Sequence, residues 1–382
     1  MKPLDAARIV FAILLLLWPW PAAADEGKIA AALKPAVESQ TLAGAVVLVA
    51  DKEKTLCVET VGYADLAAKQ PMRADNVFWI ASQSKPITAT ALMMLVDAGK
   101  VDLNDPVEKY LPEFKNQWLA VERDNDHLLL KKPSHPITVR NVLSHTSGLP
   151  FKSALEEPTL DRLPLAVGAR SYAMTPLDFD PDSDWRYSNA GINTAGRIIE
   201  VVSDMAYEDF LDQRLFQPLD MKDTTFWPNE EQLARLAKSY KPTADKSGLE
   251  ELPITQLQYP LNDRRRQPMP AGGLFSTAPD VGRFCQMILN GGQWEGKRYL
   301  SEAAVKAMTS RQTPAALKQS YGLGWATGGD SFGHGGAYAT NMSIDPARGL
   351  ITVFMVQHTG SPDVGKLNGA FVAAAREAFG EK

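Results

Sequence analysis

The stretch FWIASQSK, residues 78–85, decides how the rest of the chain is interpreted. Ser82 is the only serine with a lysine three places later, Lys85. Three residues are close to one helical turn, so both side chains would share a helix face, with the hydroxyl beside the amine. A serine hydroxyl is a poor nucleophile at neutral pH unless a neighbouring base takes its proton. The pair therefore predicts a serine acyl hydrolase.

The residues that follow predict that this stretch opens a helix. Apolar side chains recur at helical intervals from 87 to 95, and Gly99 gives a stop signal. Pro86 fits only in a first helical turn, which places Ser82 at or near the helix N-terminus. There its backbone N–H is free to face developing negative charge, as half of an oxyanion hole. A partly desolvated Lys85 would have a lowered pKa and could accept a proton or steer a second base.

Two later triplets add polar groups: Tyr187-Ser188-Asn189 and His334-Gly335-Gly336. A phenol near an ammonium would have a lowered pKa and could take part in acid–base catalysis, and Asn189 could offer its amide to a substrate carbonyl. His334 could donate to a substrate carboxylate or polarise the pocket, and the glycines let the backbone approach a ligand. Each motif alone also has a structural interpretation, as a helix cap, aromatic packing or a strand bend.

Taken in order, these motifs resemble the serine β-lactamase-related family, which includes class C β-lactamases, DD-peptidases and family VIII carboxylesterases. The likeness covers about residues 27–380 and takes in LSHTSGL at 143–149, FQPLDM at 216–221 and AGGLFS at 271–276. It implies a β-lactamase or penicillin-binding-protein-like fold, with the active site in a cleft between a mixed α/β unit and a helical one. His145, inside the first of these added motifs, is interpreted as structural.

By position, the resemblance implies a role for each polar group. Ser82 would be the acylated nucleophile, and Lys85 and Tyr187 the acid–base pair. Asn189 would hold the substrate, together with the His-Gly-Gly triplet at 334–336. The backbone N–H groups of Ser82 and Ala337 would form the oxyanion hole. The division of labour between lysine and tyrosine stays open.

The third motif departs from class C β-lactamases, which carry Lys-Thr-Gly where this chain has His334-Gly335-Gly336. A neutral imidazole lacks the permanent charge of lysine, which weakens recognition of a substrate carboxylate. Hydrolysis of an ester or amide is therefore expected ahead of β-lactamase or DD-carboxypeptidase activity. A covalent penicillin-binding receptor that does not turn over is a further alternative.

The order of elements predicts an α+β fold. Strand-like runs lie near both ends, which indicates an antiparallel sheet flanked by helices, with an inserted mostly helical domain. The expected division is a signal peptide at 1–24 and a folded domain at 25–382, whose α/β part covers about 25–100 and 271–382 and whose helical insert covers about 101–270. The predicted strands are 44–50, 55–63, 321–327, 331–335, 341–345 and 350–357, with a small hairpin near 119–130. Further helices are predicted near 29–37, 192–202 and 364–375, and after Thr277, where Asp280 three residues later completes a capping pattern.

Composition excludes other functions. The 382 residues include 45% hydrophobic and 22% charged types, as in folded globular proteins. A net charge of -5 argues against nucleic acid as a partner, and the run of three arginines at 264–266 is interpreted as a solvated loop. The expected partner is a small-molecule ester or amide, or a peptide, and the oligomeric state is left open.

No cofactor or metal is implied by the sequence. Cys57 and Cys285 are far apart, lack the spacing of metal ligands and are interpreted as buried unpaired thiols. The stretch GDSFG at 329–333 matches the nucleophile elbow of α/β-hydrolases. That motif needs a helix after the turn, and the His-Gly-Gly sequence that follows cannot open a stable one.

The N-terminus has the pattern of a secretory signal. Lys2 and Arg8 precede an apolar run from Ile9 to Trp18, and three alanines at 22–24 precede Asp25. The run is shorter than the roughly 20 residues that span a bilayer. We therefore expect an exported enzyme, periplasmic or secreted, whose mature chain has no membrane span.

Overall fold

The fold is taken from a computed structural model that describes residues 27–361 and 363–380. The predicted signal peptide at 1–24 lies outside these residues, so export stays a prediction. No helix in the described ranges is long and apolar enough to cross a membrane.

A seven-stranded antiparallel sheet joins the two ends of the chain, as predicted. Its central contact pairs β1, from the N-terminal region, with β15, from the C-terminal region, in a register that sets Leu48 opposite Val353. In spatial order the strands are β12 (Ala326–Gly328), β13 (Ser331–Gly335), β14 (Asn341–Asp345), β15 (Leu350–Met355), β1 (Gly44–Ala50), β2 (Thr55–Asp65) and β3 (Gln70–Pro71).

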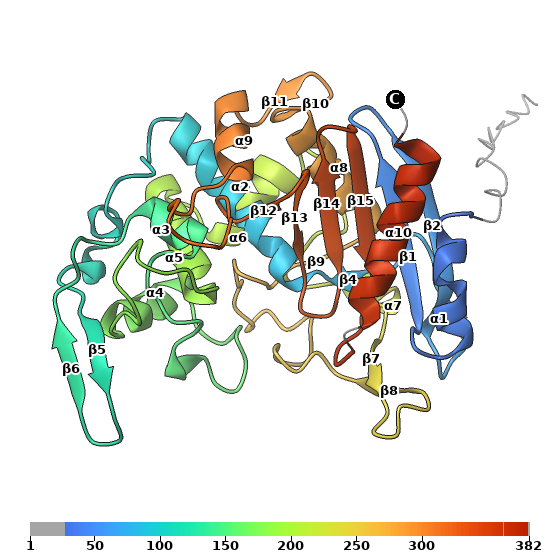
Figure 1. The fold of residues 1–382 in the computed structure, drawn as a ribbon, viewed down its shortest axis with the longest axis horizontal. Coiled ribbons are helices and arrows are strands. Elements are labelled where there is room, and N and C mark those ends of the chain that lie inside the picture. The colour runs from blue at the N-terminus through green and yellow to red at the C-terminus, as the bar shows by residue number, and fades with distance from the viewer. Residues whose placement is uncertain (1–26, 362, 381–382) are drawn as a thin grey trace, which may run out of the picture.

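Strand β1 shows why a continuous apolar run is needed at the centre. Its side chains alternate between the two faces of the sheet, and every one of them is buried. Val46 and Leu48 join the larger core with α8 (Ala278–Leu289), whereas Val47 and Val49 face the smaller core with α10 (Asp363–Phe379) and α1 (Lys34–Glu38). Figure 1 shows α10 lying across one face of the sheet.

The helical part packs around one long helix beside the β12 end of the sheet (Figure 1). Helix α5 (Asn189–Ser203) contacts α2 (Ser84–Asp97), α3 (Val139–Ser144), α4 (Leu165–Met174) and α6 (Tyr207–Leu211). The predicted hairpin is present as β5 (Leu119–Arg123) and β6 (Leu128–Lys131), which project from this part. The remaining helices and strands include η1 (Ala30–Leu33), η2 (Ala81–Gln83), β4 (Phe78–Trp79), α7 (Glu230–Ala234), β9 (Phe275–Ser276) and α9 (Glu302–Thr309). The α+β fold class is confirmed, and the division near residues 101 and 270 stays a prediction.

Two local predictions need correction. The strand expected at 321–327 is reduced to β12, because Gly324 adopts a positive φ of 73° and its N–H donates to Leu143 O at 2.8 Å, which turns the chain out of the sheet. The three arginines are not uniformly solvated. Arg265 is exposed, but Arg266 is buried and paired with Asp161, with 2.7 Å between Arg266 Nε and the carboxylate.

Both cysteines are unpaired, as expected. Cys285 is buried in the core as expected, but the expected burial of Cys57 is wrong, because this residue is only half-buried on β2. Burial raises the pKa of the Cys57 thiol to about 11, so it stays protonated at neutral pH. Within the described ranges no cluster of three or more His, Cys, Asp or Glu side chains could hold a metal ion.

Candidate active site

The segment before α2 is fixed to a distant loop. Ile80 N–H donates to Leu274 O at 3.0 Å, and the Trp79 indole donates to Gly272 O at 2.7 Å. Ala81 then takes a left-handed backbone conformation with φ of 45°, which is uncommon for a residue with a side chain. The turn η2 follows and leads into α2, so Ser82 lies at the start of a helix as predicted.

Lys85 extends its amine to the same place. Its Nζ lies 3.1 Å from Ser82 Oγ, 2.8 Å from Asn189 Oδ1 and 2.6 Å from Ala271 O. The side chain is fully buried, and this burial holds the pKa of the Lys85 amine well below its usual range. The two other oxygen atoms that contact the amine, Asn189 Oδ1 and Ala271 O, are uncharged. An uncharged amine can donate its two N–H bonds to these oxygens and turn its lone pair toward Ser82.

Tyr187 lies on the other side of the serine. Lys85 Nζ is 4.6 Å from the centre of the Tyr187 ring, and the phenol is close enough to the Ser82 side chain to interact with it. Burial raises the Tyr187 pKa above its usual range, and the interaction with Ser82 opposes this only in part. The prediction that the Tyr187 pKa is lowered is wrong. It assumed that Lys85 is an ammonium, whereas burial favours the uncharged amine of Lys85.

Asn189 is the first residue of α5, where Ser188 caps the helix by accepting from Gly191 N–H at 3.0 Å. Asn189 N–H donates to Phe151 O at 3.0 Å, so the helix start is attached to the loop at that position. The side-chain oxygen of Asn189 is already engaged by Lys85. If Asn189 contacts a substrate carbonyl as predicted, the side-chain amide nitrogen is the atom that remains to make this contact.

The turn after β13 brings backbone donors to the serine. A Cβ on Gly336 would lie 2.2 Å from Thr340 Oγ1 and 2.6 Å from Ile80 O, so only glycine fits this close approach. Ala337 N–H has no acceptor among the described residues, and Ser82 N–H lies in a first helical turn, where no intrahelical acceptor exists. The two N–H groups assigned to an oxyanion hole are thus both available.

His334 is placed differently from expectation. It is buried, its Nδ1 lies 2.7 Å from Gly335 O and its Nε2 lies 2.9 Å from the Tyr321 hydroxyl. Since a carbonyl only accepts, Nδ1 carries the proton and Nε2 accepts from Tyr321. Burial, with the nearby Lys85 adding to the effect, lowers the His334 pKa to about 3. Both ring nitrogens are occupied, so this geometry does not favour donation to a substrate carboxylate.

These groups meet at a cleft of about 320 Å³. Its wall contains Ser82, Tyr187, Asn189, Gly335, Gly336 and Ala337 from the predicted set. The two other predicted residues, Lys85 and His334, are buried and do not line it. The other lining residues are Trp79, Ala81, Phe151, Gln256, Met269, Ala271 and Gly272. The AGGLFS motif had already indicated residues 271–276, whereas Phe151, Gln256 and Met269 come from loops without a recognisable pattern.

A line of buried hydrogen bonds supports the carbonyl that accepts from Lys85. Ala271 N–H donates to Asn193 Oδ1 at 3.0 Å, Asn193 Nδ2 to the Tyr172 hydroxyl at 3.0 Å, and Tyr172 to Glu156 Oε1 at 2.7 Å. Burial raises the pKa of Glu156, and the bond from Tyr172 opposes that shift. Helices α4 and α5 thereby hold the loop beside Lys85. No sequence pattern indicated this line, because its members are far apart in the chain.

The competing elbow motif lies on a strand. Ser331 opens β13, and a turn and β14 follow it, not a helix. The strand–turn–helix context of a nucleophile elbow is therefore absent from this described segment.

Comparisons with known proteins agree with this geometry. The chain matches the model of the Beta-lactamase family over residues 29–377. It is 31% identical to protein Rv1367c of Mycobacterium tuberculosis, across 92% of this chain and 98% of that protein. It is 28% identical to esterase EstB of Burkholderia gladioli, across 85% and 82% of the two chains. Among solved structures, the chain is similar to EstCE1, a hydrolase with promiscuous acyltransferase activity, with a TM-score of 0.76 and 23% identity. The match covers 91% of this chain and 97% of EstCE1, and it shows a likeness of fold alone.

Proposed function

Because this chain belongs to the beta-lactamase family of serine hydrolases, we propose that it cleaves a small uncharged ester or amide through an acyl-enzyme on Ser82. The observation that carries the proposal is the position of Lys85 Nζ, which is buried and 3.1 Å from Ser82 Oγ. A buried amine beside a hydroxyl is the arrangement needed to activate a serine nucleophile.

Acylation begins when Lys85 takes the Ser82 proton and Oγ attacks the substrate carbonyl carbon. The carbonyl oxygen becomes an oxyanion, which the N–H groups of Ser82 and Ala337 stabilise. As the C–O or C–N bond breaks, Tyr187 gives its proton to the leaving group, and the Lys85 ammonium restores it. The raised pKa of Tyr187 suits this residue to the role of proton donor, because the phenol stays protonated until the leaving group becomes a strong base.

Deacylation reverses these transfers with water as the nucleophile. Water loses a proton through Tyr187 and Lys85 and attacks the acyl carbon, and the same two N–H groups hold the second oxyanion. When the new acid departs, Ser82 regains its proton. The enzyme returns to its starting state with no cofactor in the cycle.

The chemistry of the cleft wall supports an uncharged substrate. No Asp, Glu, Lys, Arg or His is among the residues that line it. His334 lies behind the wall with both ring nitrogens engaged, and Lys85 is enclosed by Ser82, Asn189 and Ala271. A substrate carboxylate, as in a β-lactam or a D-Ala-D-Ala peptide, would meet no fixed positive charge there. The relative EstB is an esterase by name, which agrees with this ranking.

The test is hydrolysis of p-nitrophenyl acetate and butyrate, nitrocefin and a D-Ala-D-Ala peptide by the wild type, Ser82→Ala and Ser331→Ala. We expect kcat/KM to be highest for the esters, to fall by about 10³-fold or more in Ser82→Ala, and to be unchanged in the control Ser331→Ala. Near-native turnover by Ser82→Ala would contradict the assignment. Intact-mass spectra separate the alternatives: a persistent penicillin adduct without turnover indicates a receptor, and faster nitrocefin or peptide cleavage indicates a β-lactamase or a DD-carboxypeptidase.

A further inference from the structure

His145 contacts the backbone on both sides of Tyr187. Its carbonyl oxygen accepts from Arg186 N–H at 3.1 Å, and its ring Nδ1 accepts from Ser188 N–H at 3.2 Å. One residue therefore accepts from the backbone N–H groups of the residues immediately before and after Tyr187. Tyr187 precedes α5 and lies outside regular structure, so no helical hydrogen bond restrains it.

The backbone of His145 makes this double contact possible. The residue ends α3 in the left-handed conformation, with φ of 63° and ψ of 29°. This conformation is uncommon for a residue with a side chain, and Asn and His tolerate it better than most. It turns the carbonyl and the imidazole toward the same neighbouring segment. His145 is 1% exposed, so neither group faces solvent.

The imidazole also packs on the phenol. The ring centres of His145 and Tyr187 are 4.7 Å apart, and those of His145 and Tyr321 are also 4.7 Å apart. The ring of Trp185 packs edge-on against His145, with 5.9 Å between the two ring centres. The ring of Tyr187 is thus restrained from behind, while its hydroxyl reaches Ser82.

The contact to Ser188 requires an uncharged imidazole. Nδ1 can accept an N–H only when it carries no proton of its own. Burial lowers the pKa of His145 well below its usual range, and any positive charge gained by the neighbouring Lys85 or His334 would lower it further. Nε2 then carries the proton and has no hydrogen-bond partner within the described part of the chain. The acceptor at Nδ1 is therefore present at neutral pH.

From these contacts we propose that His145 is a positioning residue for Tyr187: it holds the backbone N–H groups of Arg186 and Ser188, so that the phenol between them stays beside Ser82 and Lys85. The inference rests on the proposed function, in which Tyr187 transfers a proton. His145 is not among the residues that line the cleft, so the inference gives it no contact with a substrate. Its effect on the rate comes from geometry, since a displacement of about 1 Å in a catalytic group can lower a rate by roughly 100-fold.

The test uses three substitutions that separate the two ring nitrogens. In His145→Asn the amide oxygen replaces Nδ1, and Asn tolerates the left-handed backbone. In His145→Gln the amide oxygen lies where Nε2 was, and His145→Ala removes both. We expect kcat for ester hydrolysis to fall roughly 10- to 100-fold in the Ala and Gln variants, with little change in KM, and to stay near the wild-type value in the Asn variant. Active-site titration corrects each rate for the folded fraction.

A double-mutant cycle with Tyr187→Phe distinguishes positioning from a general loss of structure. If His145 acts through the phenol, His145→Ala should cause no further loss in a Tyr187→Phe background. Rescue by Gln instead of Asn, additive losses, or a wild-type rate in His145→Ala would each overturn the inference. Failure of the proposed function looks different, because Ser82→Ala or Tyr187→Phe would then retain activity themselves.

Discussion

At the scale of single residues, Lys85 shows how surroundings determine chemistry. Its amine contacts Asn189 Oδ1 and Ala271 O, both uncharged, and no carboxylate is among its partners in the described structure. A carboxylate would favour the ammonium, whereas burial among neutral acceptors favours the free amine. The Ser-x-x-Lys pattern indicates that the two side chains are neighbours, but it does not indicate how completely Lys85 is enclosed.

The lowered pKa of Lys85 predicts an acid limb in the pH profile. As pH falls through that pKa the amine gains a proton and can no longer accept one from Ser82, so kcat/KM for ester hydrolysis should drop tenfold per pH unit. Lys85→Arg keeps its charge at every pH and should lose about 10²–10⁴-fold across the whole range. A rate that increases on acidification would show that the charged form is the active one.

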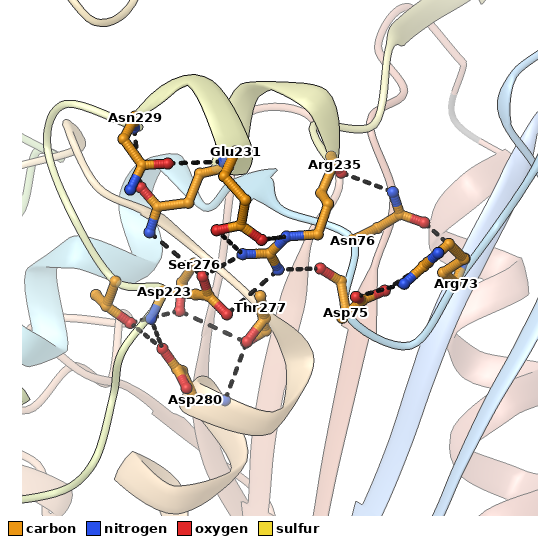
Figure 2. A network of polar contacts seen from close by, with 12 residues as sticks. Arg73, Asp75, Asn76, Asp223, Asn229, Glu231, Arg235, Ser276, Thr277 and Asp280 are labelled. Carbon is orange, nitrogen blue, oxygen red and sulfur yellow. Dashed lines mark hydrogen bonds and ion pairs between the residues drawn. The ribbon is translucent and has the colours of Figure 1, made fainter.

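At the scale of elements, the start of α8 confirms one half of the predicted capping pattern, the Thr277 cap, but not the other, the return contact from Asp280. Thr277 does cap the helix, by accepting from Asp280 N–H. The carboxylate of Asp280 turns instead to a neighbouring loop, where it accepts from Asp223 N–H at 2.8 Å and from the Thr224 hydroxyl at 3.0 Å. Figure 2 shows Asp280 at one end of the resulting polar network.

Arg235 lies at the centre of that network and connects it to the segment before β4. Figure 2 shows its guanidinium between the carboxylates of Glu231 and Asp223. It also donates to Asp75 O at 2.6 Å, and its own carbonyl accepts from Val77 N–H at 3.0 Å. The start of the stretch that carries Ser82 is thereby attached to α7.

The raised pKa of Asp280 predicts that stability decreases with pH in a limited window. Burial raises this pKa from 3.8 to about 6, so between those values the folded protein holds a proton that the unfolded chain has lost. The free energy of unfolding should therefore decline as pH rises from about 4 to about 6, by about 3 kcal/mol at most, and show no further change from this group above that.

Urea unfolding at several pH values checks this. Asp280→Asn cannot titrate and should remove the decline, whereas Glu302→Gln, an exposed acid in the first turn of α9, should leave it in place. An equal pH slope in Asp280→Asn and the wild type would refute the assignment.

At the scale of the whole molecule, one buried ion pair joins two loops near the cleft. Arg266 donates to Asp161 and also to Phe226 O at 2.8 Å. The backbone carbonyl of Asp161 accepts from Gln267 N–H at 2.8 Å, and the Asp161 carboxylate accepts from Gln258 N–H at 3.0 Å. The loop that supplies Gln256 and Met269 to the cleft is therefore held to the helical part by this pair.

Removing one partner should destabilise the protein strongly. Arg266→Met leaves the Asp161 charge buried without its partner, so the free energy of unfolding should fall by about 3–5 kcal/mol. Arg265→Met is the matched control, because Arg265 is 88% exposed in its side chain, and its effect should stay within about 0.5 kcal/mol. Similar losses in the two variants, measured by urea unfolding at pH 7, would contradict a special role for the buried pair.

Local patterns predicted much of this protein correctly. The strands at 44–50, 331–335 and 341–345 have the predicted bounds, because alternation and turn residues depend only on near neighbours in the chain. The helix after Ser82 and the family were also predicted, because four ordered motifs are specific together even where each one is common.

Other properties depended on which distant segments surround a group. Full burial makes Lys85 a weak base, and partial burial raises the pKa of Tyr187. Tyr321 engages His334, and Asp161 pairs with Arg266. Desolvation and pairing arise from atoms that are distant in the chain or on another element, so periodicity and spacing do not report them. Sequence thus identified the polar groups that meet at the candidate site, and long-range packing set their protonation and their partners.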